Sequence, residues 1–170
     1  GAAALWEGLA QSDANDAESR RMLFELARAR RDYAEMEKQL SAIRATAPDG
    51  PESVFTEAAY QIALATRDGV APEERRDLLR KADETLAAAE STRLGWTEFA
   101  RLRAELALLQ GRWDTAIRLL QDLHSRGLAT EGQTAQLIQL LFLTGREDEA
   151  DALLASVQPD RRRPELRRIQ

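Results

Sequence analysis

Apolar residues along this chain recur at helical spacing in segments of about 10–20 residues, separated by short runs of glycine, proline and acidic residues. In 32–46, for example, Met36, Leu40 and Ile43 stand at i, i+4 and i+7. No stretch alternates apolar and polar residues for long enough to indicate a strand. The pattern predicts an all-α chain and leaves open a further helix after Pro164. The expected helices cover residues 2–11, 17–30, 32–46, 52–66, 72–90, 96–110, 113–125, 130–144 and 147–157.

One part of this pattern repeats. Gly111 and Gly145 are 34 residues apart, and small or apolar residues match at the same offset on both sides of them. The matched pairs are Ala104 with Ile138, Ala107 with Leu141, Ala116 with Ala150, Leu120 with Leu154, and Leu123 with Val157. A third copy has Tyr33 in place of Trp113, at an offset of 80, so one intervening unit holds about twelve extra residues, which we place within 69–90. Because short loops make successive helices antiparallel neighbours, the repeat predicts stacked helical hairpins. We expect Leu120 and Leu154 to be core residues.

A helix–turn–helix period of 34 residues resembles the tetratricopeptide repeat (TPR), in degenerate form. The resemblance is carried by small or apolar residues at the helix crossings, by Gly111 and Gly145 in the turn, by an aromatic after that turn (Tyr33, Trp113), and by Pro48 at the end of a unit. The Leu-Gly and Tyr of the family's first helix are largely missing, and the copy at 147 lacks the aromatic. An unrelated helical solenoid of similar period is the alternative.

The resemblance implies a right-handed α-solenoid of antiparallel helix pairs, a TPR-like superhelix. Residues 1–16 would be the second helix of a truncated preceding repeat. Repeats would follow at 17–50, at 51–94 with the insertion and a long second helix, at 95–128 and at 129–160. Residues 161–170 would be a basic tail or the start of a capping helix.

In this family the first helix of each pair lines the concave face, so residues on those helices that face away from the apolar stripe are the expected protein-binding residues. They are Arg21, Glu25 and Arg28; Thr56, Tyr60 and Ala63; Arg101, Glu105 and Leu108; and Ala135, Gln139 and Phe142. The Lys/Asn pattern with which TPR domains clamp a terminal carboxylate is absent. The arginines could bind acidic ligand groups through bidentate contacts, or pair with Glu25 and Glu105 at i, i+4.

The helix expected over 130–144 is apolar around nearly its whole circumference, so we expect it to be buried on all sides. One of its faces then needs a cover from outside the repeat. A capping helix with Leu166 and Ile169 could supply it, or a protein partner, including a second copy of the chain.

Composition limits the chemistry. The chain has no cysteine and a single histidine, His124, which excludes disulfides, thiolate sites, histidine-based metal sites and a histidine-rich catalytic centre. There is no phosphate-binding glycine loop or nucleophile motif, and the acidic clusters fall at helix starts or on outer faces. No catalytic residue, metal site or cofactor is predicted. Residues 161–168 contain a basic cluster, but the chain as a whole has a net charge of −5, so no nucleic-acid face is predicted. No apolar run is long enough to insert into a membrane.

These observations predict a non-catalytic scaffold that binds a protein or peptide segment in its concave face. Two alternatives remain: a self-assembly module that pairs through the 130–144 helix, or an interaction domain appended to a larger enzyme or envelope protein. Because the chain begins with Gly1 rather than methionine, we expect it to be cut from a longer one. The residues do not indicate the partner, the compartment or the organism.

Overall fold

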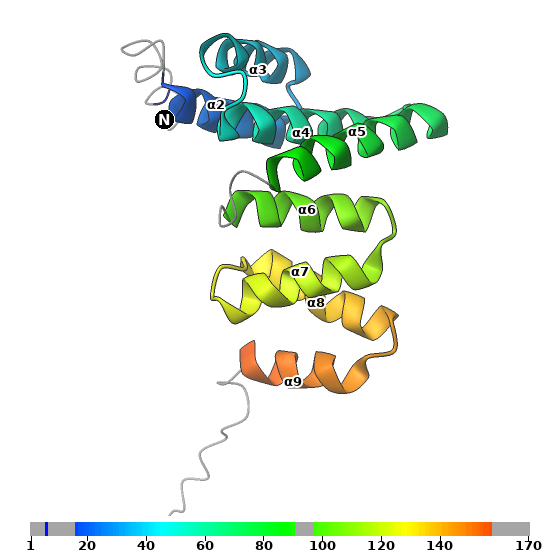
Figure 1. Cartoon of the computed structure of the whole chain (residues 1–170). Helices are drawn as coiled ribbons and strands as arrows, with labels where there is room; N and C mark the ends of the chain where they lie inside the picture. The colour runs from blue at the N-terminus through cyan, green and yellow to red at the C-terminus, as the bar shows by residue number, and fades with distance from the viewer. Residues whose placement is uncertain (1–5, 7–15, 91–96, 158–170) are drawn as a thin grey trace, which may run out of the picture. The chain divides into compact units, whose positions relative to one another are not determined.

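The computed structural model describes residue 6 and residues 16–90 and 97–157 (Figure 1). These residues form helices and no strand, which confirms the all-α prediction. The helices are α2 (Ala17–Arg30), α3 (Tyr33–Thr46), α4 (Pro51–Ala65), α5 (Pro72–Glu90), α6 (Thr97–Leu109), α7 (Trp113–Ser125), α8 (Glu131–Leu143) and α9 (Glu147–Val157). Their ends agree with the predicted ranges to within one residue. The helices expected over 2–11 and after Pro164 fall outside the described residues.

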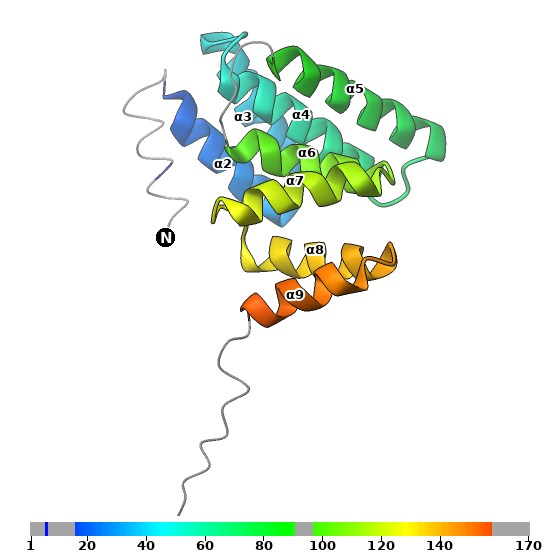
Figure 2. The same ribbon diagram turned by 60° about the horizontal axis from the view of Figure 1, so that its bottom comes forward.

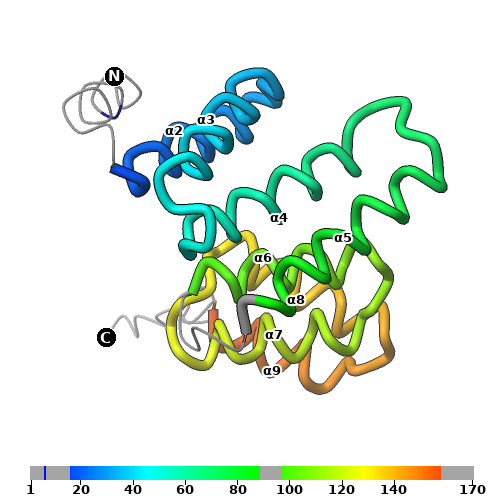
Figure 3. The backbone as a smooth tube through the Cα atoms, turned by 45° about the horizontal axis from the view of Figure 1, so that its top comes forward, coloured from blue at the N-terminus to red at the C-terminus, as the bar shows by residue number. Residues whose placement is uncertain are grey.

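The chain has two compact units, Gly1–Gly111 and Arg112–Gln170, which we call unit 1 and unit 2. The division falls between the two helices of the repeat predicted over 95–128. In unit 1, α2 packs against α3 and α4 against α5, and the members of each pair run antiparallel (Figures 1 and 3). In addition, α3 packs on α4, α5 on α6, and α4 contacts both α2 and α6. The helix α4 therefore contacts each of the other four described helices of unit 1.

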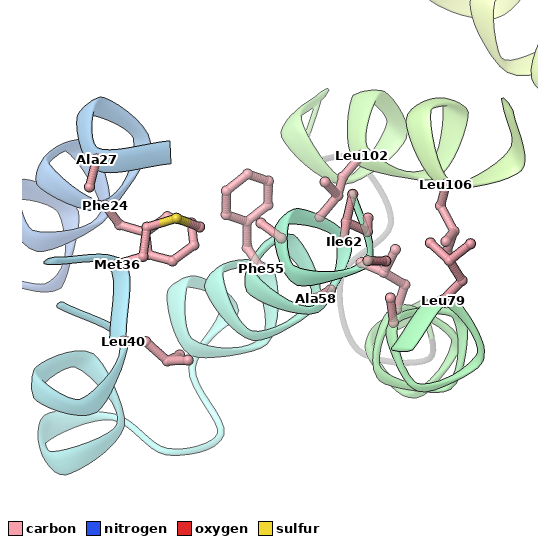
Figure 4. Close-up of a cluster of buried hydrophobic side chains, with 14 residues drawn as sticks. Phe24, Ala27, Met36, Leu40, Phe55, Ala58, Ile62, Leu79, Leu102 and Leu106 are labelled. Atoms are coloured by element: carbon pink, nitrogen blue, oxygen red, sulfur yellow. The ribbon is translucent and has the colours of Figure 1, made fainter. Parts of the chain in front are cut away.

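The core of unit 1 is continuous across these helices (Figure 4). Phe24 of α2 meets Met36 of α3 at one end, and Leu79 of α5 meets Leu106 of α6 at the other. Between them α4 contributes large side chains together with alanines, and the alanines allow neighbouring helices to approach its backbone closely. The buried residues of α4 are Ser53, Phe55, Thr56, Ala58, Ala59, Ile62 and Ala65.

The turn inside the helical hairpins has the same backbone conformation in all three copies of the repeat. Gly111 and Gly145 have φ of 70° and 73°, and Arg31, which stands two residues before Tyr33, has φ of 57°. At Gly145 the amides of Gly145 and Arg146 donate to the carbonyls of Phe142 and Leu141, which closes the end of α8 in a Schellman motif. The left-handed residue is thus present even where the sequence does not supply a glycine.

In unit 2, α7 packs on α8 and α8 on α9, and the last two run antiparallel side by side (Figure 2). Leu120 of α7 is 1% exposed, as expected for a core residue. The matching expectation for Leu154 of α9 is wrong, because that side chain is 36% exposed. The helix α8 follows α7 and packs on it, whereas within the described residues no helix follows α9 to cover Leu154.

The 130–144 helix, for which one face was expected to need a cover from outside the repeat, is only partly covered within the described residues. Leu137, Leu140 and Leu141 are buried, but Phe142 is 44% exposed and Leu143 82% exposed. The two neighbours of α8 in its unit, α7 and α9, cover only part of its circumference.

Candidate protein-binding surface

An ion pair joins the two helices that flank α4 in unit 1. Nη2 of Arg28, on α2, lies 2.8 Å from Oε2 of Glu105, on α6, and Nη1 of Arg28 lies 3.9 Å from Oε1 of Glu25. All three residues were expected in the binding face, and the structure brings them together although Arg28 and Glu105 are 77 positions apart. Arg28 therefore pairs both within α2, with Glu25, and between helices, with Glu105. We call Arg21, Glu25, Arg28 and Glu105 the α2–α6 charge cluster.

Two aromatic rings lie beside this cluster. The guanidinium carbon of Arg21 is 5.9 Å from the ring centroid of Phe55 on α4. The Phe55 ring meets Phe99 of α6 edge to face, with centroids 6.1 Å apart and an interplanar angle of 83°. Phe55 is buried and Phe99 is partly exposed. The cluster therefore combines charges of both signs with an aromatic contact from each of two helices.

The charges of the cluster are partly withdrawn from water. About a third of the Glu25 side chain is exposed (32%), and those of Arg28 and Glu105 are exposed to a similar degree. Burial raises the pKa of the Glu25 carboxyl above its usual value, while Arg28 and Arg21 act in the opposite direction and Glu105 adds to the rise. An ionic contact made in such partial shelter is stronger than one made at an open surface, because water screens it less.

The two predicted residues of α4 lie in other surroundings. Thr56 is fully buried, and its hydroxyl donates to the carbonyl of Glu52 at 2.7 Å, so the expectation that it lines an open face is wrong. The reason is that α2, α3, α5 and α6 all pack on α4. Tyr60 is half-buried, and burial raises the pKa of its phenol, with a further contribution from Glu37 of α3. The charges that act on Tyr60 are thus those of Glu37 and Arg67 rather than those of the α2–α6 charge cluster.

The remaining predicted residues divide between the two units. Arg101 is partly exposed and lies one turn before Glu105 on α6. Gln139 and Phe142 are exposed on α8, in unit 2. Sequence reasoning therefore found one set of residues that the fold assembles, on α2 and α6, and a second set that belongs to a different compact unit.

Unit 2 contains a cavity that sequence reasoning did not identify. Its volume is about 530 Å³, and most of its walls come from α8, α9 and the end of α7. His124, the single histidine of the chain, lines this cavity with Nδ1 3.4 Å from Oγ1 of Thr134. The lining residues are His124, Gly127, Ala129, Glu131, Thr134, Ala135, Ile138, Leu154 and Val157. The signal was present in the sequence as apolar residues that share one face of each helix, but their meeting depends on how α8 and α9 pack.

Within the described ranges, no cluster of three or more histidine, cysteine, aspartate or glutamate side chains has the arrangement to hold a metal ion. The described helices also include none with the length and apolarity needed to cross a membrane. Comparisons of the chain with protein-family models, with curated proteins and with solved structures find no match.

Proposed function

We propose that this chain is a non-catalytic protein-interaction scaffold built from tetratricopeptide-like hairpins in a right-handed superhelix. In this proposal a segment of a partner protein binds on the first helices α2 and α6, where their charged side chains meet beside α4. The order of packing in unit 1 supports it. The first helix α4 contacts the first helices α2 and α6, while α3 pairs with α2 and α5 pairs with α4. This order is the one expected when hairpins stack in line.

The observation that carries the proposal is the α2–α6 charge cluster. Arg28 and Glu105 come from different helices and remain about a quarter and two fifths exposed, so a ligand can reach both. A guanidinium has five N–H donors, which lets Arg28 hold Glu105 and a carboxylate of a ligand together. The partly exposed Phe99 adds apolar surface nearby. The cluster suits a peptide segment that carries an acidic residue next to an apolar one.

Self-assembly through α8 is the second candidate function. It is supported by the exposure of Phe142 and Leu143, two large apolar residues at the end of that helix. Light scattering over a range of concentrations tests it directly. A particle that stays monomeric at high concentration would exclude this function, and association that Phe142→Glu abolishes would support it.

A charge exchange at the cluster tests the main proposal. The probe is a phage library of random dodecapeptides selected on the immobilised full chain, followed by affinity measurements on the enriched peptides. Arg28→Glu should lower both thermal stability and peptide affinity, because it places a third acid beside Glu25 and Glu105. The double change Arg28→Glu with Glu105→Arg restores the ion pair, so stability should return, while affinity should stay about tenfold or more below that of the original chain.

The matched control is Arg76→Glu on α5, since Arg76 is an exposed arginine whose partner Glu73 is also exposed. It should leave both the stability and the peptide affinity nearly unchanged. Two results would contradict the proposal: a selection that enriches no peptide, or a double variant that is stable and binds the enriched peptides as tightly as the original chain.

A further inference from the structure

The helices α8 and α9 leave a stripe of apolar side chains uncovered in unit 2. On α8, the apolar residues Ala135, Ile138 and Phe142 stand at i, i+3 and i+7, which places them on one face, and Glu131 stands four positions before Ala135 on the same face. Across the cavity from Ala135 and Ile138, α9 presents Leu154 and Val157, two apolar residues that are both exposed. The cavity of about 530 Å³ includes Ala135, Ile138, Leu154 and Val157 among its lining residues. We call Glu131, Ala135, Ile138, Phe142, Leu154 and Val157 the α8–α9 groove.

The repeat indicates the shape that fits this groove. Leu154 and Val157 stand 34 positions after Leu120 and Leu123, and those two leucines are buried in α7, on which α8 packs. In the preceding hairpin, therefore, the helix with the equivalent positions, α7, has a further helix, α8, packed against it. A helix that presents apolar residues at i, i+3 or i+4, and i+7 matches the spacing of such a stripe.

The charges around the groove are acidic. Glu131 lines the cavity, and Glu147 and Asp151 lie on the same face of α9 as Leu154, seven and three positions before it. Residues 131–157 contain five acidic side chains and one arginine, Arg146, whose Nε is 2.7 Å from Oε1 of Glu149. Before this segment the next arginine, Arg126, is paired with Asp122 at 3.2 Å, and after it the next arginine is Arg161, outside the described residues. A partner with basic side chains beside its apolar stripe complements this rim.

The same charges disfavour a second copy of this chain as the occupant. Two copies related by a twofold axis would place the same patch on itself, so the acidic residues Glu131, Glu147 and Asp151 of one copy would face the acidic rim of the other. Repulsion between like charges at an interface opposes such pairing.

We infer that the α8–α9 groove binds an amphipathic helix of a partner protein, with aliphatic residues on one face and arginine or lysine on either side of them. This site uses different residues from the α2–α6 charge cluster and does not depend on the function proposed for that cluster.

A designed peptide tests the inference on the full chain. The probe is a fluorescent 14-residue peptide with leucines at i, i+4, i+7 and i+11 and with arginine and alanine elsewhere, followed by fluorescence anisotropy. A scrambled peptide of the same composition has no apolar face, and a third peptide has glutamate in place of arginine. We expect the leucine-faced basic peptide to bind about tenfold or more tightly than either of the others, with an affinity that falls as salt is added.

Variants of the groove locate the site. Ile138→Glu should abolish binding even though the added negative charge favours a basic peptide, because it places a carboxylate in the apolar stripe. Gln136→Glu is the matched control, since Gln136 is exposed on the same helix outside the stripe, and this change should leave the affinity unchanged. Ala135→Tyr fills the groove from an exposed position without removing a core side chain, so it should block binding in a fully folded chain.

Four results would overturn the inference. The first is equal binding of the scrambled peptide, and the second is binding that Ala135→Tyr leaves unchanged. The third is dimerisation of the chain, lost on Ala135→Tyr, which would make a second copy the occupant. The fourth is binding that appears only after Leu166→Glu and Ile169→Glu, which would make the chain's own C-terminal residues the occupant.

Discussion

The helices α7 and α9 carry matching apolar positions and differ in what surrounds them. Leu120 and Leu123 of α7 are buried, whereas Leu154 and Val157 of α9, 34 positions later, are exposed by more than a third. The first residue of each apolar stripe is equally buried, because Ala116 on α7 and Ala150 on α9 are both fully buried. The difference teaches that a repeat specifies which side chains are apolar, while the helix that follows decides whether they are covered.

The largest expected effect is on unfolding free energy when the two leucines are truncated. Leu120→Ala should lower it by about 2–5 kcal/mol, because it removes buried methyl groups and leaves a cavity. Leu154→Ala should cost only about 1 kcal/mol, since its side chain already contacts water. Urea unfolding followed by far-ultraviolet circular dichroism measures both. Equal costs would show that α9 is covered as fully as α7.

Substitutions at the left-handed residues of two of the turns should change stability in opposite directions. A Cβ at Gly145 would have no heavy atom within 4 Å, so the cost of Gly145→Ala comes from its positive φ alone and should be about 1 kcal/mol. Arg31→Gly should raise stability by less than about 1 kcal/mol, because glycine accepts that conformation but also makes the unfolded chain more flexible. Arg31 also forms an ion pair with Asp68, but both side chains are exposed, so this pair contributes little to stability. Thermal unfolding of the two variants checks the signs, and a destabilising Arg31→Gly would contradict this reasoning.

The smallest expected effect is on the pH dependence of the unfolding free energy, and it comes from two carboxyls. One is Glu25 in the α2–α6 charge cluster of unit 1, and the other is Glu149 on α9. The pKa of Glu25 is raised by burial, so its contribution to stability is present below its unfolded value near 4.5 and is lost as the pH rises through the folded value. The pKa of Glu149 is lowered by its hydrogen bonds to Arg146, so its contribution is present above that value and is lost as the pH falls.

Unfolding free energies at pH 3 to 7 therefore distinguish the two residues. Relative to the original chain, Glu25→Gln should gain stability as the pH rises above about 4.5, whereas Glu149→Gln should lose stability as the pH rises toward about 4.5. The same pH dependence for both variants would contradict the assigned directions.

The helix ends could be predicted because their causes are local. The side chains of Asp16 and Asp32 accept hydrogen bonds from the amides of Ser19 and Glu35, at 3.0 and 3.1 Å, and so begin α2 and α3. Thr130 and Gln133 form a reciprocal capping box at the start of α8. Each of these contacts spans three residues, so the sequence pattern contains it completely.

The candidate site could be predicted only in part. Helical spacing placed Glu25 and Arg28 on one face of α2 and predicted Glu105 for the corresponding face of α6. It did not predict that Arg28 would bind Glu105, because that contact requires both helices to pack on α4. The burial of Thr56 escaped prediction for the same reason, since the spacing of a helix does not reveal how many neighbours it has.

The amino-acid sequence by itself determined the helices, their ends and the positions of their apolar stripes, because these depend on contacts over a few residues. The tertiary structure decided which stripes are covered. It also decided that α2 and α6 share an ion pair and that α8 and α9 enclose a groove. Burial and pairing at these places arise from residues far apart in the chain, and only the packing of whole helices brings them together.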